Sequence, residues 1–216
     1  ELNKSLDAFF KSEEAAIKAK YIVGQGTAFS SIADVYSVMG NSKNARLYYN
    51  KAIQLLRKTD NAIGLASALL NAGDEYSKNK KYDLALAYFN ESGIIFKKAN
   101  YLSGTAYNLG NIGMVYAEQG KNALAEKYIS EGIKILEELK DYYAISDYLT
   151  YMSDIYLKKN EWTTALKYAQ RSLMLAQKYG LKEQISNSNL KLSELYQNVG
   201  NAKASFKYFK DHIAYR

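Results

Sequence analysis

Apolar and polar positions repeat along the chain with a period of 40 residues. The clearest markers are two tyrosine columns, the second twelve residues after the first, with one member of each in every 40-residue unit. The first column is Tyr36, Tyr76, Tyr116, Tyr156 and Tyr196, and the second is Tyr48, Tyr88, Tyr128, Tyr168 and Tyr208. A fixed period of this length indicates a solenoid of similar supersecondary units, not a globular domain.

Small side chains recur at fixed offsets from the first tyrosine. Three residues before it stand Ala33, Gly73, Gly113, Ser153 and Ser193, and nine after it stand Ala45, Ala85, Ala125, Ala165 and Ser205. Offsets of three, four and seven within each half describe one face of an α-helix. Small residues on that face let two antiparallel helices approach closely, and glycines such as Gly40 and Gly120 suit a helix end. Each unit is therefore predicted to be a helical hairpin.

The pattern predicts eleven helices and an all-α fold. We expect one helix at about 2–20, followed by hairpins at 22–39 with 42–58, 62–79 with 82–98, 102–119 with 122–139, 142–159 with 162–178, and 182–199 with 202–215. The whole chain, 1–216, is expected to form a single solenoid domain with repeats at 21–60, 61–100, 101–140, 141–180 and 181–216. Residues 1–20 are expected to be the second helix of a preceding repeat.

The segments Leu109–Tyr116 and Ala125–Ile129 carry small and large residues in an order that resembles the tetratricopeptide repeat family. The resemblance covers essentially the whole chain, and it implies a right-handed α-solenoid whose first helices line a concave groove for a partner peptide. Family repeats have about 34 residues and usually close with a proline. This chain has a longer period and no proline, as in tetratricopeptide variants of bacterial signalling and sensor proteins.

The resemblance places partner-binding residues on the inner face of the first helices. Two positions before each anchor tyrosine stand Asp34, Asp74, Met114, Asp154 and Glu194, and four of these five are acidic. An acidic row favours a basic partner. Alternatively, these acids form ordinary surface ion pairs, because Lys78 and Lys158 lie four residues after Asp74 and Asp154.

Five positions before the anchor tyrosine, Asn71 and Asn111 are the best candidates for binding a ligand's backbone, since an amide side chain both donates and accepts hydrogen bonds. The alternative is that these asparagines tie adjacent repeats together. Tyr107 and Tyr151 are candidate aromatic anchors in the groove. Most other tyrosines are expected in the core with a solvated hydroxyl.

The amino-acid composition argues against several classes of function. One histidine and no cysteine leave no common nucleophile–base pair, so we expect no catalytic, cofactor-binding or metal-binding residues and no cofactor. His212 is expected to face solvent or to begin a different contact. The net charge is +7, carried by 25 lysines and only four arginines, which argues against nucleic acid as the partner. No membrane-spanning segment is apparent, and we expect a cytoplasmic protein.

The expected partner is therefore a protein or peptide, bound in the groove. Tyr208–Ile213 resembles the last repeat of bacterial sensor proteins, which suggests an alternative: a regulatory region of a larger signalling protein whose output domain is a nucleotide cyclase, a histidine kinase or a DNA-binding domain. Homodimerisation through end or groove surfaces is a further possibility, because the end of a solenoid exposes apolar surface.

Overall fold

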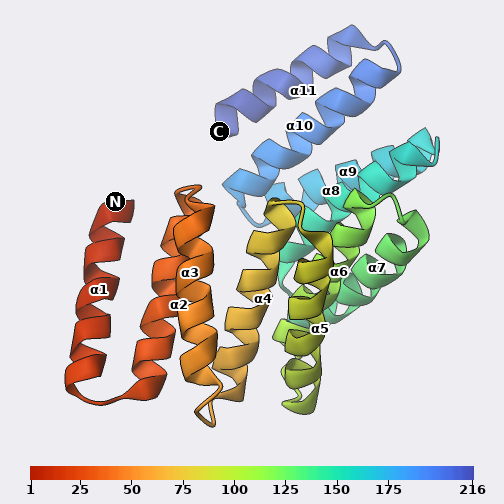
Figure 1. Cartoon of the computed structure of the whole chain (residues 1–216). Coiled ribbons are helices and arrows are strands. Elements are labelled where there is room, and N and C mark those ends of the chain that lie inside the picture. The colour runs from red at the N-terminus through yellow and green to blue at the C-terminus, as the bar shows by residue number, and fades with distance from the viewer. The chain divides into compact units, whose positions relative to one another are not determined.

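The computed structural model describes all 216 residues and contains eleven α-helices and no strand (Figure 1). The helices are α1 Leu2–Lys18, α2 Ile22–Val38, α3 Ser42–Leu56, α4 Ala62–Lys78, α5 Tyr82–Lys98, α6 Leu102–Glu118, α7 Asn122–Leu139, α8 Tyr142–Lys158, α9 Trp162–Lys178, α10 Lys182–Asn198 and α11 Ala202–Tyr215. Every helix begins at the predicted residue. The all-α hairpin prediction is confirmed, and even-numbered helices are the first helices of their hairpins.

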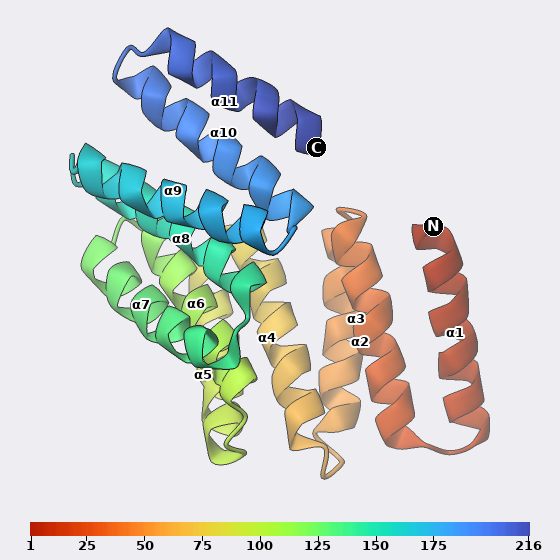
Figure 2. The same cartoon turned by 180° about the vertical axis from the view of Figure 1, so that it is seen from behind.

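The chain divides into two compact units, residues 1–111 and 112–216, with the boundary inside α6. In the first unit, α1 to α5 run alternately in opposite directions, each beside its neighbour in sequence, and both views agree on this order (Figures 1 and 2). In the second unit, α8 with α9 and α10 with α11 form the same kind of antiparallel pair. The assignment of all 216 residues to one domain stays a prediction.

The helices end in the same way at almost every turn. A residue with positive φ follows each of nine helices at intervals of 20 or 40 positions: Lys20, Gly40, Lys80, Asn100, Gly120, Lys140, Asn160, Gly180 and Gly200. The next N–H then donates back to the carbonyl five residues earlier, as Asn41 does to Tyr36 at 2.8 Å. This left-handed cap explains the predicted breaks. The exception is α3, which ends at Leu56, two residues earlier than the repeat register predicts, and which is not followed by a residue with positive φ.

The two tyrosine columns pack against each other inside each hairpin. The ring centroids of Tyr36 and Tyr48 are 5.6 Å apart, and those of Tyr196 and Tyr208 are 5.5 Å apart. Tyr76 with Tyr88 and Tyr156 with Tyr168 are also stacked, whereas the rings of Tyr116 and Tyr128 are tilted by 39° at a centroid distance of 5.6 Å. All ten rings are half-buried, so each pair joins the two helices while its hydroxyl groups can reach water.

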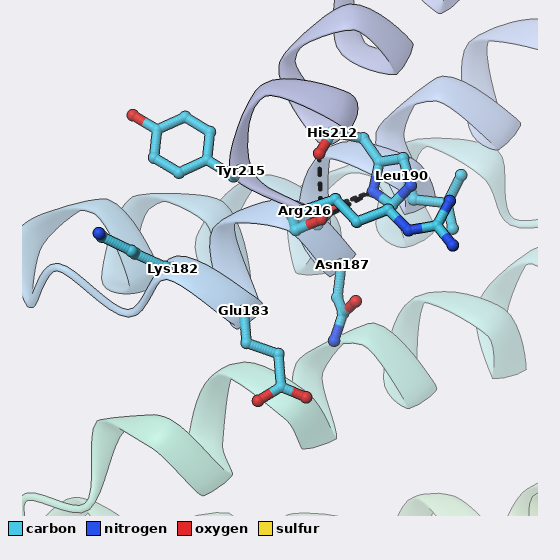
Figure 3. A pocket seen from close by; sticks show the side chains of 8 residues that line it. Lys182, Glu183, Asn187, Leu190, His212, Tyr215 and Arg216 are labelled. Carbon is cyan, nitrogen blue, oxygen red and sulfur yellow. Dashed lines mark hydrogen bonds between the residues drawn. The ribbon is translucent and has the colours of Figure 1, made fainter. Parts of the chain in front are cut away.

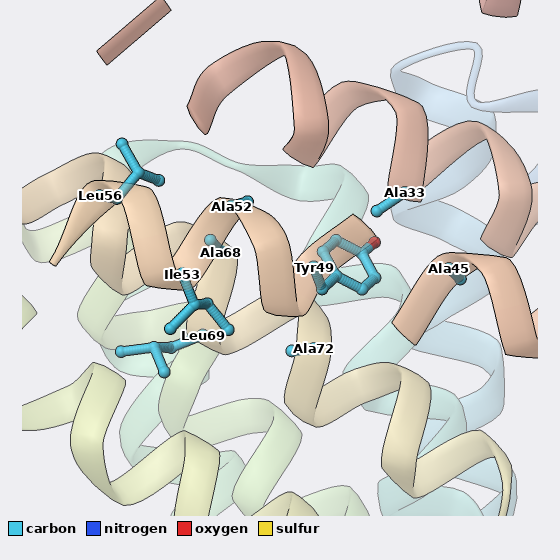
Figure 4. Packing of buried hydrophobic residues seen from close by; sticks show 9 residues of the cluster. All are labelled: Ala33, Ala45, Tyr49, Ala52, Ile53, Leu56, Ala68, Leu69 and Ala72. Atoms are coloured by element: carbon cyan, nitrogen blue, oxygen red, sulfur yellow. The ribbon is translucent and has the colours of Figure 1, made fainter. Parts of the chain in front are cut away.

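Small residues bring the helices of a hairpin into close contact. Ala45 and Ala125 are fully buried. A Cβ added at Gly113 of α6 would lie 2.6 Å from the Ile129 side chain of α7, closer than a methyl group tolerates. Figure 4 shows how the core continues from one hairpin to the next: Tyr49 and Ile53 of α3 belong to one cluster with side chains of α2 and α4.

One buried position departs from the repeat. The residue before each anchor tyrosine is aliphatic in four units, but in the second unit it is Glu75, whose exposed fraction is 1%. Its carboxylate accepts hydrogen bonds from Ser37 Oγ at 2.8 Å and Asn79 Nδ2 at 3.1 Å. A buried carboxylate with neutral donors retains a desolvation cost that an aliphatic residue would not have.

Candidate binding groove on the first helices

Neighbouring first helices are joined by polar contacts in a single register. Asn71 Nδ2 of α4 donates to Asp34 Oδ1 of α2 at 3.0 Å. Lys191 Nζ of α10 lies 2.8 Å from Asp154 Oδ1 of α8, at the same two positions of the repeat. For Asn71, the structure therefore shows the contact between repeats that the sequence offered as the alternative to ligand binding.

Asp34 is half-buried. Burial raises the pKa of its carboxyl, and hydrogen bonds from Tyr49 and Asn71 together with the charge of Lys78 offset only part of that rise. The Tyr49 hydroxyl donates to Asp34 Oδ1 at 2.6 Å. Asp34 is therefore a hydrogen-bond acceptor within the packed helices, and its Oδ1 already accepts two hydrogen bonds, from Tyr49 and from Asn71.

The two predicted surface ion pairs behave differently. Asp74 pairs with Lys78 at 2.7 Å, as predicted. The predicted partner of Asp154, Lys158, is wrong: Lys158 Nζ donates to the Ala117 carbonyl at 3.4 Å, and Lys191 pairs with Asp154. Lys191 is favoured because it also reaches Glu194 at 2.6 Å, so two carboxylates share an ammonium group whose side chain is only 18% exposed.

A hollow of about 310 Å³ opens on the inner side of α8 and α10, within the second unit. Its lining is Glu118, Asp147, Thr150, Tyr151, Asp154, Asn187, Leu190, Lys191 and Glu194. Four carboxylates face one ammonium group, so the hollow is acidic. Burial alone would lower the pKa of Lys191, but Asp154 and Glu194 more than reverse this and raise it, so Lys191 remains charged.

A second hollow of about 660 Å³ adjoins the first along α10 and is bounded by α11. The two hollows share Asn187 and Leu190. Figure 3 shows Lys182, Glu183 and Asn187 on α10, with Tyr215 and Arg216 on the last turn of the chain. Because Lys182 and Arg216 are cationic, the charge becomes less acidic from the α8 side of α10 to the α11 side.

His212 is half-buried at the edge of this second hollow, so the expectation that it faces solvent is wrong. Its Nδ1 lies 3.0 Å from the Ser186 carbonyl and 2.9 Å from Ser186 Oγ. At the same repeat position, Ser172 Oγ donates to the Ser146 carbonyl. His212 thus substitutes an imidazole for a serine hydroxyl in a structural hydrogen bond, which is the different contact that the sequence allowed.

The sequence profile described as "Tetratricopeptide repeat" matches residues 24–92 and 102–178, about two thirds of the chain. The chain belongs to the tetratricopeptide repeat family. No curated protein matches it. No group of three or more His, Asp or Glu side chains is arranged to hold a metal ion. None of the helices is both long and apolar enough to span a lipid bilayer.

Solved structures share this tetratricopeptide fold at low sequence identity. The chain is similar to BtubC (BKLC) from P. vanneervenii, with a TM-score of 0.79 and 16% identity over 100% of this chain and 91% of that one. It is similar to the apo form of RapI, with a TM-score of 0.69 and 17% identity over 98% and 97%. A Rap protein complexed with Competence and Sporulation Factor matches with a TM-score of 0.79 and 12% identity over 97% and 69%.

The tetratricopeptide register explains which predicted site residues come together. Tyr151, Asp154 and Glu194 line the same hollow, whereas Tyr107 and Asn111 lie on α6 in the first unit. Sequence reasoning missed Asp147 and Asn187. Both stand in the same repeat column as Tyr107, at 40-residue intervals, so extending that column would have identified them. Asp34, Asp74, Asn71 and Lys78 form internal contacts in the first unit, and their role in binding stays a prediction.

Proposed function

We propose that this chain is a non-catalytic interaction module that binds an extended peptide segment along α10, across the two adjoining hollows. The observation that carries the proposal is the shared lining: Asn187 and Leu190 belong to both hollows, so one ligand can contact both. Asn187 is exposed and offers a donor and an acceptor to a peptide group. Leu190 and Tyr151 supply apolar and aromatic surface for side chains.

The charges in the hollows suggest the ligand's chemistry. The acidic hollow between α8 and α10 suits a lysine or arginine side chain of the peptide, because its lining has four carboxylates, those of Glu118, Asp147, Asp154 and Glu194, and one ammonium group. The hollow beside α11 offers Lys182 and Arg216 to a carboxylate. A peptide with a basic residue on one side of Asn187 and an acidic group on the other therefore matches the pattern.

In the first unit, α6 offers Tyr107 and Asn111 as further contacts for the same class of ligand. Asn71 is a weaker candidate, because one of its amide protons is committed to Asp34. Asp34 already accepts hydrogen bonds from Tyr49 and Asn71 at its Oδ1. Asp74 and Lys78 neutralise each other at 2.7 Å, so their contribution to a ligand is expected to be small.

Two solved relatives support a peptide ligand. One is a Rap protein complexed with Competence and Sporulation Factor, and another is a Rap conjugation gene regulator in complex with the Phr* peptide. A second candidate function, sensing within a larger signalling protein, is supported by a STAND protein with a tetratricopeptide repeat sensor from Pyrococcus horikoshii, in which the match covers 33% of that chain. We place the module in the cytoplasm in either case.

A peptide-display selection tests the proposal. Peptides enriched on the wild-type chain are measured for affinity against the double variant Tyr151→Ala/Asn187→Ala. We expect at least tenfold weaker binding, because truncating central contacts costs more than about 1 kcal/mol each. Lys167→Ala, an exposed change on α9 of the same unit, is the control and should leave affinity unchanged. Equal affinity of the double variant, or a selection that enriches no peptide, would contradict the proposal.

A further inference from the structure

A third hollow, of about 620 Å³, lies at one end of the α4–α5 hairpin, within the first unit. Its lining is Thr59, Asp60, Ala62, Leu65, Ile94, Ile95, Lys98 and Ala99. We call it the α4–α5 hollow. It is bounded by the first turn of α4, the last turn of α5 and the turn that precedes α4. None of its lining residues belongs to the groove along α10, so it is a separate site.

Two positions of the repeat are small in this hairpin and larger in the others. Ala62 is the first residue of α4, and Ala99 follows the last residue of α5. The equivalent pairs in three other hairpins are Ile22 with Thr59, Leu102 with Leu139, and Tyr142 with Tyr179. Among these four hairpins, α4–α5 alone has alanine at both positions. The missing side-chain volume explains why a hollow opens here.

The α8–α9 hairpin shows which groups fill this place in the repeat. The rings of Tyr142 and Tyr179 stack there with centroids 3.9 Å apart and an interplanar angle of 7°. Lys178 Nζ lies 5.3 Å from the centroid of the Tyr179 ring, a cation–π contact. Lys98, in the lining of the α4–α5 hollow, stands at the same repeat position as Lys178. The hollow therefore keeps the lysine of this arrangement and lacks the rings.

The walls of the hollow are also kept. Leu65, Ile94 and Ile95 correspond to residues of the α8–α9 hairpin that are equally apolar, namely Ile145, Met174 and Leu175. The one change of charge is Asp60, which stands where the other hairpin has Lys140. The exposed carboxylate of Asp60 offers an acceptor to the N–H of an indole or the O–H of a phenol. An aromatic ring with a polar edge thus matches the whole lining.

The openness of the hollow favours a ring that is carried by a polypeptide. Ile94 is 70% exposed, and Ala62 and Ala99 are exposed as well. A free ring would leave Ile94 in water, whereas an aliphatic residue next to the ring in a polypeptide would cover it. We propose that the α4–α5 hollow binds a tryptophan or tyrosine side chain of a partner polypeptide, with an aliphatic neighbour on Ile94. Aromatic anchors in pockets commonly dominate such contacts.

Fluorine NMR tests the proposal with a short peptide that carries one fluorotryptophan between two leucines. The fluorine label separates the signal of the peptide from that of Trp162 in the chain. We expect saturable binding to the wild-type chain, at least threefold tighter than that of free fluoroindole. Lys98→Met should weaken binding about two- to fivefold, because it removes the cation above the ring. Lys97→Met, at an exposed neighbour outside the lining, should leave affinity unchanged.

Two double variants exchange the hollow between the hairpins. Ala62→Tyr/Ala99→Tyr rebuilds the stacked pair in α4–α5 and should weaken peptide binding at least tenfold. Tyr142→Ala/Tyr179→Ala removes the pair from α8–α9 and should raise the number of peptide sites from one to two per chain. The second variant decides the question should the first fold poorly. Tyr151→Ala/Asn187→Ala, in the groove along α10, should leave binding of this peptide unchanged.

Four results would overturn the proposal. The first is no saturable binding of the peptide to the wild-type chain. The second is equal binding by the wild type and a folded Ala62→Tyr/Ala99→Tyr variant. The third is binding of free fluoroindole as tight as that of the peptide, which would assign the hollow to a small molecule. The fourth is a concentration-dependent dimer that the filled variant abolishes, which would assign it to a second copy.

Discussion

Asp154 and Lys191 form a 2.8 Å ion pair between two consecutive first helices, at the same repeat positions at which Asp34 accepts a 3.0 Å hydrogen bond from Asn71. The inner row of this solenoid therefore has a structural function in both units. In the second unit, the same pair also lines the hollow in which we place the ligand. Some residues that line the groove also join neighbouring first helices. Each substitution of such a residue therefore needs a stability measurement as well as a binding measurement.

A double-mutant cycle of Asp154→Asn and Lys191→Gln should give a coupling energy above about 0.5 kcal/mol, because the Lys191 side chain is only 18% exposed. The matched cycle is Asp74→Asn with Lys78→Gln, a pair whose lysine side chain is 57% exposed. Its coupling should stay below about 0.5 kcal/mol. Urea unfolding at neutral pH measures both. Equal coupling energies would show that an ion pair between repeats stabilises the fold no more than an ion pair within one helix.

Asp34→Asn tests the cost of its buried charge. Because burial raises the folded-state pKa of Asp34 above 3.8, the folded state holds the proton more tightly than the unfolded state. The contribution of Asp34 to stability is therefore greatest at low pH and is lost as pH rises through the raised pKa. Relative to the variant, the wild type should gain stability between pH 7 and about pH 4.

The pH comparison is measured by urea unfolding at both pH values. Asp7→Asn, at an exposed residue of α1, controls for general charge effects. A stability difference between wild type and Asp34→Asn that stays constant with pH, or grows toward pH 7 in favour of the wild type, would contradict a raised pKa of Asp34 in the folded state.

Glu75→Val should raise the free energy of unfolding by about 1 kcal/mol or more, because replacing a buried charge with an apolar side chain removes its desolvation cost. Valine occupies the equivalent positions 35 and 115, so it fits the site. Ser37 and Asn79 are partly or fully exposed and can bond to water instead. Thermal and urea melts check the sign. A clear loss of stability would mean that the Ser37–Glu75–Asn79 bonds are needed.

Lys80→Gly should stabilise the chain by about 0.5–1 kcal/mol, because lysine at φ 58° is strained and glycine is not. Lys134→Gly is the opposite control: Lys134 is exposed in the interior of α7, so glycine there should cost about 0.5–1 kcal/mol. Both are read from urea unfolding. If the two variants changed stability in the same direction, the left-handed cap at residue 80 would be wrong.

The sequence was sufficient for the helices because its columns repeat without slippage. Every helix start follows from the tyrosine columns, and the small residues at Ala45 and Gly113 predicted the close contact within each hairpin. It was less informative for the site. Nothing local in the sequence shows that Asp154 prefers Lys191 over Lys158, because that choice depends on how the next helix approaches. The left-handed backbone at Lys80 and Asn100 was also not predicted, since neither residue is the glycine usual at a left-handed cap.

The most direct test of the central claim maps a selected peptide ligand on the chain by hydrogen exchange. The account predicts slower exchange in α8 and α10 on binding, reduced by Tyr151→Ala/Asn187→Ala, and little change in the outer surface of α9. Slowed exchange confined to second helices such as α9, with α8 and α10 unaffected, would contradict a ligand groove on the first helices.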